Sequence, residues 1–114
     1  MVFRMVLAAS VLLATPVMAQ EVSEKADQAM WCASAINLLD TLGVYPADAA
    51  NPVALAQQWT RRALQEFDAA GFSDAEVGML IQSYAEEVAM QVPDYLVSSD
   101  EDALRHNIYA CSEP

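Results

Sequence analysis

The sequence predicts an all-α protein: a compact four-helix domain, packed as a bundle or as an orthogonal array, with one disulfide joining the first and last helices. Three observations predict this class. Apolar residues recur at intervals of three and four along most of the chain, no segment alternates apolar and polar residues as strands do, and the connections between periodic segments are short. The periodicity fits both packings, so the choice between bundle and array stays open.

Residues 1–19 have the features of a secretory signal peptide. A single basic residue precedes an apolar stretch, and Pro16 interrupts that stretch just before a small-residue cleavage site. A membrane-spanning helix needs about 20 apolar residues, which this stretch does not supply. We therefore expect cleavage before Gln20, export to the periplasm, and a single helical domain over residues 20–114 without stable membrane insertion. A retained membrane anchor is the alternative.

The expected mature domain is strongly acidic. Without the leader it keeps four basic residues against 16 acidic ones, a net charge of −12 when histidine is neutral. This charge repels phosphate backbones and anionic lipid headgroups, so binding to nucleic acid or to a membrane surface is disfavoured. A basic protein or peptide partner is compatible with the charge, although the charge can also serve only to keep the domain in solution.

Cys32 and Cys111 are the two cysteines of the chain. Export would place them in an oxidising compartment, and two cysteines allow a single pairing. We therefore expect a disulfide between the first helix and the end of the chain. Closing a loop of about 80 residues is worth about 4 to 5 kcal/mol on the chain-entropy estimate. Because there is no CxxC motif, a thioredoxin-like role has no support.

The first two helices are delimited by capping residues. The first is predicted over about 24–42, with Ser23 as the N-cap and Gly43 at the left-handed position after its end. The second is predicted over about 52–70, where Asn51 is the N-cap and a proline follows at the first helical position.

The third helix has the strongest local signal of the sequence. Ser73 and Glu76 form a capping box, and an apolar series follows at helical spacing to about Gln91. Val92-Pro93 is expected to end this helix, because the residue before a proline disfavours the helical conformation.

A fourth helix is predicted from a serine cap at Ser98 or Ser99 to about Ala110. Leu104, Ile108 and Cys111 would form its apolar stripe. The segment 95–97 between the third and fourth helices is apolar for a loop. We expect it to cover the end of the core, and an exposed partner patch is the alternative.

Tyr45 and Tyr95, which lie in the expected connections, are the aromatic residues predicted to be most exposed. If they lie together they would make a recognition patch, because exposed aromatic residues concentrate binding energy. Four other aromatic residues fall on or beside the core stripes and are expected to be buried: Trp31, Trp59, Phe67 and Tyr84.

His106 is the single histidine, and helical angles place it away from the core stripe. We expect a solvated side chain that pairs with Asp102 four residues earlier. The alternative function is a haem or metal carrier that uses His106 with Met30, Asp102 or another carboxylate. Met30 is likewise placed outside the core arc, and no CxxCH motif is present, so the haem alternative is the weaker one.

No catalytic motif stands out in the sequence. The acidic clusters fall at helix starts, where they complement the helix dipole, or on an expected outer face, as for Glu86-Glu87. Arg61 and Arg62 are expected on a solvated helix face. The sequence therefore favours a non-enzymatic exported protein, without cofactor or metal, that binds another envelope protein as an accessory subunit, inhibitor or chaperone.

Overall fold

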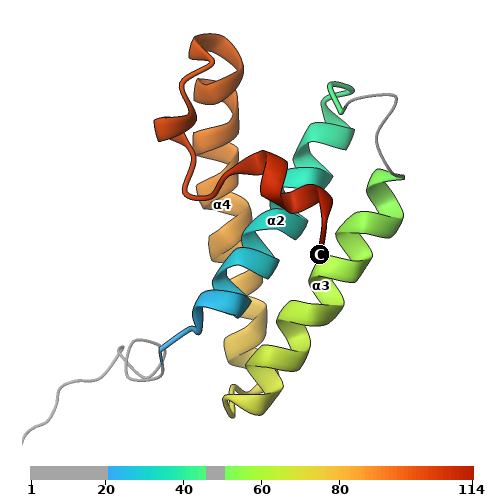
Figure 1. Cartoon of the computed structure of the whole chain (residues 1–114). Coiled ribbons are helices and arrows are strands. Elements are labelled where there is room, and N and C mark those ends of the chain that lie inside the picture. Colours follow the sequence, from blue (N-terminus) through green and yellow to red (C-terminus); the bar gives the residue numbers. More distant parts are fainter. Residues whose placement is uncertain (1–20, 46–50) are drawn as a thin grey trace, which may run out of the picture.

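The computed structural model describes residues 21–45 and 51–114. No strand occurs in these two ranges, so the all-α prediction is confirmed. Within these ranges, three α-helices and two short 3₁₀-helices follow one another (Figure 1): α2 (Glu24–Thr41), α3 (Pro52–Ala69), α4 (Asp74–Ser98), η1 (Glu101–Ala103) and η2 (Ile108–Ser112).

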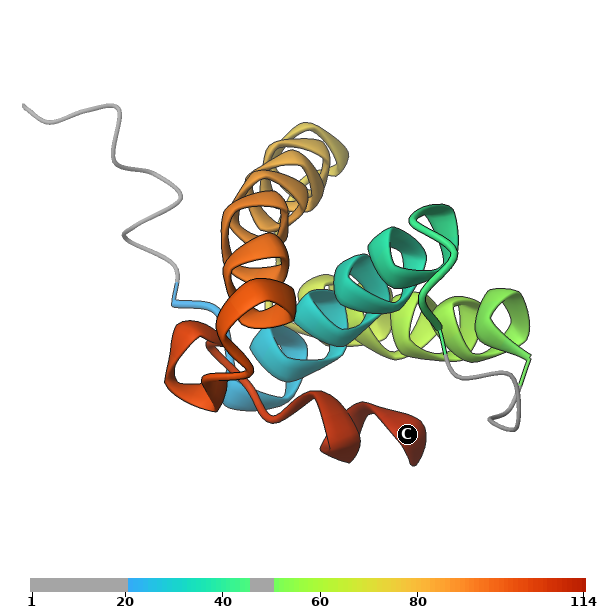
Figure 2. The ribbon, with the colours of Figure 1, turned by 90° about the horizontal axis from the view of Figure 1, so that it is seen from above.

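Helix α2 lies at the centre of the fold. It packs against both α3 and α4, whereas α3 and α4 make little contact with each other. Seen from above, α2 lies between the other two helices, which diverge from their connection (Figure 2). After α4 the chain turns back, crosses in front of α2 and ends beside α3 (Figure 1). The described residues therefore form a three-helix arrangement closed by a C-terminal strap, here defined as residues 99–114.

The middle of α2 is buried around almost its whole circumference. Between Ala29 and Ile36 every residue is buried except Ser34, which is half-buried. A helix that is apolar on all sides is one enclosed by its neighbours. The prediction that Met30 lies outside the core is wrong, since its side chain is only 3% exposed. The prediction assumed a free outer face, whereas α3, α4 and the C-terminal strap surround this part of α2.

The helix starts predicted from capping residues are confirmed. Ser23 accepts a hydrogen bond from a backbone N–H of the first turn of α2, and Asn51 does the same for α3. At the start of α4, Ser73 and Glu76 exchange reciprocal hydrogen bonds of 2.8 and 3.2 Å as a capping box. Gly43 has a φ of 73°, the left-handed conformation that follows many helices.

Helix α4 does not end at Val92-Pro93 but continues to Ser98, which corrects the prediction. Proline inside a helix removes a backbone hydrogen bond and costs about 3 kcal/mol. Here Pro93 lies on the exposed face, where water can reach the carbonyl that loses its partner. Continuing the helix also keeps Val92 fully buried and packs Tyr95 against the core. Ser99, with a φ of 59°, then ends α4 in the left-handed conformation.

The predicted fourth helix is absent, and the C-terminal strap forms η1 and η2 instead. The carboxylate of Asp100 and the amide oxygen of Asn107 each accept a hydrogen bond from the backbone N–H two residues further on. Such local bonds compete with helical hydrogen bonding. Leu104, between the two turns, is extended, with a ψ of 141°.

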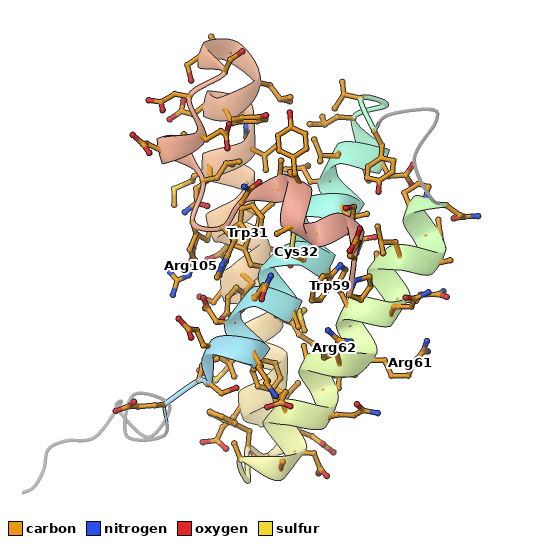
Figure 3. All side chains as sticks on the ribbon, in the orientation of Figure 1. Trp31, Cys32, Trp59, Arg61, Arg62 and Arg105 are labelled. Atoms are coloured by element: carbon orange, nitrogen blue, oxygen red, sulfur yellow. A yellow bond between two sulfur atoms is a disulfide. The ribbon has the colours of Figure 1, made fainter. Side chains whose placement is uncertain are left out.

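The predicted disulfide is present between Cys32 and Cys111, with a Cα–Cα distance of 5.4 Å. It joins α2 to η2, a 3₁₀-helix, and not to a fourth α-helix. Both cysteines are almost fully buried. The indole N–H of Trp59 on α3 donates a hydrogen bond of 2.6 Å to the backbone oxygen of Cys111. The end of the chain is thus held between α2 and α3 (Figure 3).

None of the helices in the described part of the chain is both long enough and apolar enough to cross a membrane. The predicted leader, residues 1–19, lies outside the described residues, so its cleavage stays a prediction.

Candidate functional site

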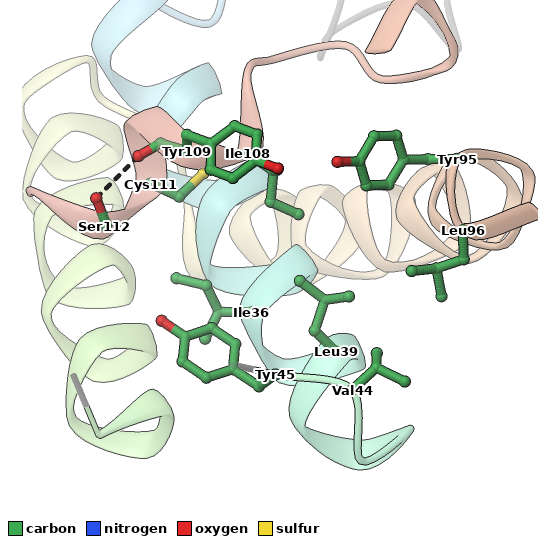
Figure 4. A pocket seen from close by; sticks show the side chains of 10 residues that line it. All are labelled: Ile36, Leu39, Val44, Tyr45, Tyr95, Leu96, Ile108, Tyr109, Cys111 and Ser112. Atoms are coloured by element: carbon green, nitrogen blue, oxygen red, sulfur yellow. Dashed lines mark hydrogen bonds between the residues drawn. The ribbon is translucent and has the colours of Figure 1, made fainter. Parts of the chain in front are cut away.

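An apolar pocket of about 290 Å³ opens at the end of the molecule where α2 and α4 finish. Three elements form its walls: the last turns of α2 with the two residues that follow, the last turns of α4, and η2 (Figure 4). Ten residues line it: Ile36, Leu39, Val44, Tyr45, Tyr95, Leu96, Ile108, Tyr109, Cys111 and Ser112.

Each wall has a local cause in the sequence. The continuation of α4 beyond Pro93 adds the turn that carries Tyr95 and Leu96. The left-handed Gly43 turns the chain after α2, and Val44 and Tyr45 follow it. The third wall, η2, is fixed against α2 by the disulfide at Cys111.

The opening of the pocket is surrounded by exposed apolar side chains. Tyr109 is 68% exposed, Val44 47% and Leu96 42%. Leu42 and Val97, within two residues of these in the sequence, are also exposed. Clusters of exposed apolar side chains at a concave surface mark sites of interaction.

The structure brings the two predicted tyrosines, Tyr45 and Tyr95, to the same pocket. Figure 4 shows the hydroxyl of Tyr95 facing that of Tyr109 across the opening. A side-chain hydrogen bond with Tyr109 is the main cause that raises the pKa of Tyr95, and burial raises this pKa further. Burial also raises the pKa of Tyr45. A contact of these tyrosines with a partner stays a prediction.

Tyr109 is the aromatic pocket residue that sequence reasoning missed. The signal for it was present, because a residue two positions before Cys111 must lie close to α2 once the disulfide forms. The apolar periodicity of this segment predicts a helix, and Tyr109 does not belong to the apolar stripe of that helix.

A second cluster of polar side chains surrounds Asp27 on α2. One carboxylate oxygen accepts a hydrogen bond from the hydroxyl of Tyr84 on α4. The other lies 2.9 Å from Nε of Arg105 and 2.7 Å from Nε2 of His106, both in the C-terminal strap. The predictions of a solvated His106 and of its pairing with Asp102 are therefore wrong. They rested on helical angles in a segment that is not an α-helix.

The electrostatics of this cluster favour an ionised Asp27. Burial alone would raise the pKa of its carboxyl, but hydrogen bonds from Arg105, Tyr84 and His106 together hold the pKa below its usual value. Burial and the hydrogen bond to Asp27 raise the pKa of the Tyr84 hydroxyl, which stays protonated. The hydrogen bond to Asp27 raises the pKa of Arg105.

Gln91 and Glu87 of α4 extend the cluster. The side-chain oxygen of Gln91 accepts hydrogen bonds of 3.0 Å from the indole of Trp31 and from the backbone N–H of Arg105. Glu87 forms an ion pair of 3.2 Å with Arg105, and its side chain is only 24% exposed. Glu87 was expected on a solvated outer face, which the C-terminal strap in fact covers. These contacts attach the strap to both α2 and α4.

The alternative function as a haem or metal carrier depends on where Met30 and His106 lie. Met30 lies in the core, His106 contacts Asp27 and the ring of Trp31, and neither lines the apolar pocket. Among residues 21–45 and 51–114, no group of three or more His, Cys, Asp or Glu side chains is arranged to hold a metal ion.

Arg62 lies over the ring of Trp59, 5.4 Å from its centroid. This contact is a cation–π interaction on the surface of α3, away from the pocket. Arg62, which was expected only on a solvated helix face, therefore also packs against Trp59.

Comparisons of the chain with models of protein families, with curated proteins and with solved structures found no significant match.

Proposed function

We propose that this chain is a small exported, non-enzymatic protein that acts by binding another protein of the cell envelope. Its binding surface is the apolar pocket between α2, α4 and η2. The observation that carries this proposal is the cavity of about 290 Å³ ringed by tyrosines and exposed aliphatic side chains. Tyrosine is enriched where binding energy concentrates in protein interfaces.

The size and chemistry of the pocket favour a protein side chain as its occupant. Small-molecule sites usually range from about 300 to 1,000 Å³ and contain a few well-placed polar groups. With about 290 Å³ this pocket lies just below that range, and its lining is mainly apolar, with the hydroxyls of three tyrosines and of Ser112 as its polar side-chain groups. The hydroxyl of Ser112 donates to the backbone oxygen of Tyr109, and no acid or base lies beside it in the lining. These features support binding more than catalysis.

Two features support export to the periplasm. The disulfide between Cys32 and Cys111 is of the kind that persists in an oxidising compartment. The leader sequence has the charge, length and small-residue site of a secretory signal.

The test is capture of partners from the envelope of the host under mild crosslinking. Three forms of the mature protein are compared: the wild type, a pocket variant Leu96→Ser/Tyr109→Ser, and a control variant Met79→Ser. All three substituted side chains are exposed, and Met79, at 62%, lies near the opposite end of α4. The three proteins should therefore fold alike, which thermal melting verifies.

The proposal expects one protein to be recovered with the wild type and with Met79→Ser but lost with the pocket variant. Recovery that does not differ among the three forms, including no recovery from any of them, would overturn it.

A further inference from the structure

We propose that the pocket binds a basic polypeptide segment, inserting one bulky apolar side chain of the partner while Lys or Arg residues beside that side chain meet carboxylates around the opening. This inference rests on the proposed function and names the chemistry of its partner.

The shape of the pocket suits a single inserted side chain. Ile36 and Leu39 line it from α2, while Tyr45 lies on one side of it and Tyr95 and Tyr109 on another (Figure 4). The volume of about 290 Å³ is too small for a whole amphipathic helix. An extended segment that crosses the opening would place one side chain inside and leave its two neighbours outside.

The basic residues of the described chain all lie away from this pocket. Lys25 is in the first turn of α2, at the far end from the pocket. Arg61 and Arg62 line a separate hollow on α3, and Arg105 is paired with Asp27 and Glu87 (Figure 3). No positive side chain from the described residues therefore lines the pocket.

Exposed carboxylates, in contrast, stand next to two lining residues in the sequence, and a third acts electrostatically on Tyr95. We define the acidic rim as Asp40, Asp94 and Glu101. Asp40 follows the lining residue Leu39, Asp94 precedes Tyr95, and the charge of Glu101 acts on Tyr95. All three are exposed.

No ion pair among the described residues neutralises the acidic rim. In the described part of the chain, ion pairs involve no carboxylates other than those of Asp27 and Glu87. The rim therefore keeps its negative charge, which attracts a cationic partner and speeds its association.

The same charge disfavours the other occupants of an apolar pocket. Two copies of a mature chain with a net charge of −12 repel each other, so self-association through this end is unfavourable. Anionic lipid headgroups are repelled for the same reason.

The test measures fluorescence anisotropy of synthetic peptides added to the mature, disulfide-bonded protein at low and at high salt. One peptide carries a central Leu-Phe-Leu between lysines, a second carries the same centre between glutamates, and a third carries Ser-Gly-Ser between lysines. We expect the first to bind at least about tenfold more tightly than the second at low salt. The ratio should fall as salt screens the rim.

Two matched pairs of substitutions locate the effect. The rim variant Asp94→Asn/Glu101→Gln should bring the Lys-flanked peptide with the Leu-Phe-Leu centre close to the affinity of the Glu-flanked one. The control Asp68→Asn/Glu86→Gln, which removes the same charge from exposed positions elsewhere, should change the affinity much less. The pocket variant Leu96→Ser/Tyr109→Ser and the Ser-Gly-Ser peptide should both abolish tight binding.

The outcomes separate the inference from the proposed function. If Lys- and Glu-flanked peptides bind equally at low salt and both are lost with the pocket variant, the basic partner is refuted while the pocket stands. If the rim and control variants weaken binding equally, the rim is likewise refuted. If peptide binding does not depend on Leu96 and Tyr109, the inference and the proposed binding surface both fail.

Discussion

Asp27 shows how a single residue can hold one part of the C-terminal strap against the helices. Its carboxylate receives hydrogen bonds from Tyr84 on α4 and from Arg105 and His106 in the C-terminal strap, although the side chain is only 15% exposed. A buried charge is tolerated when it is paired and fully hydrogen-bonded. Replacing the carboxylate by an amide would remove the charge and leave a single acceptor oxygen for the three donors.

Substitution of Asp27 by asparagine should destabilise the fold and make its stability depend less on pH in acid. Hydrogen bonds to charged groups contribute about 1.5 to 3 kcal/mol each, so we expect a loss of about 2 to 3 kcal/mol near neutral pH. Urea unfolding at pH 7 measures this loss. Asp40→Asn, at an exposed position without an ion-pair partner in the described chain, is the control and should change stability by less than about 0.5 kcal/mol.

The pH dependence of the wild type follows from the lowered pKa of Asp27. The group is ionised more readily in the folded than in the unfolded state, so its contribution is complete above its ordinary pKa of 3.8. The contribution is lost as pH falls below that value, through the lower pKa of the folded state. Wild-type stability should therefore fall more steeply than that of Asp27→Asn below pH 4. Parallel curves for the two proteins would contradict this account.

At the scale of elements, helix starts were predictable and the C-terminal third was not. Ser23, Asn51 and the capping box of α4 depend on neighbouring backbone groups, so the sequence alone reveals them. The continuation through Pro93 depends on tertiary burial that outweighs a local penalty. The sequence predicted Tyr45 and Tyr95 to be the most exposed aromatic residues, but both are half-buried and Tyr109 is more exposed, at 68%. The pocket that joins the three depends on the path of the strap.

Substitution of Pro93 by alanine tests the interpretation of α4. The change restores a helical hydrogen bond, and the greater freedom of the unfolded chain offsets part of the gain. We expect stabilisation of about 1 to 2 kcal/mol, seen as a higher midpoint of thermal unfolding, with the helical circular-dichroism signal unchanged or slightly increased. Destabilisation by this substitution would show that the chain does not continue as a helix through this position.

At the scale of the whole molecule, the disulfide between Cys32 and Cys111 serves both stability and the pocket. It closes a sequence separation of 79 residues and holds η2, one of the three walls, against α2. The ion pairs of Arg105 and the hydrogen bond from Trp59 fix the same strap at two further points. The pocket is therefore a property of the closed chain and not of any one helix.

The double substitution Cys32→Ser/Cys111→Ser should lower the free energy of unfolding by up to about 4 to 5 kcal/mol. At temperatures where the helices remain folded, it should also weaken binding of the Lys-flanked peptide with the Leu-Phe-Leu centre, because η2 loses its covalent attachment. Calorimetry and anisotropy measure the two effects. Full affinity in a folded protein without the disulfide would show that the strap does not depend on it.

Nuclear magnetic resonance with the ¹⁵N-labelled mature protein tests the central claim most directly, namely that the apolar pocket is the binding surface. Titration with the Lys-flanked peptide carrying Leu-Phe-Leu should shift backbone amide signals of residues 36–45, 94–97 and 108–112, and leave the exposed face of α3 around residues 57–65 unchanged. Shifts concentrated on α3, or no shifts at any residue, would contradict the account.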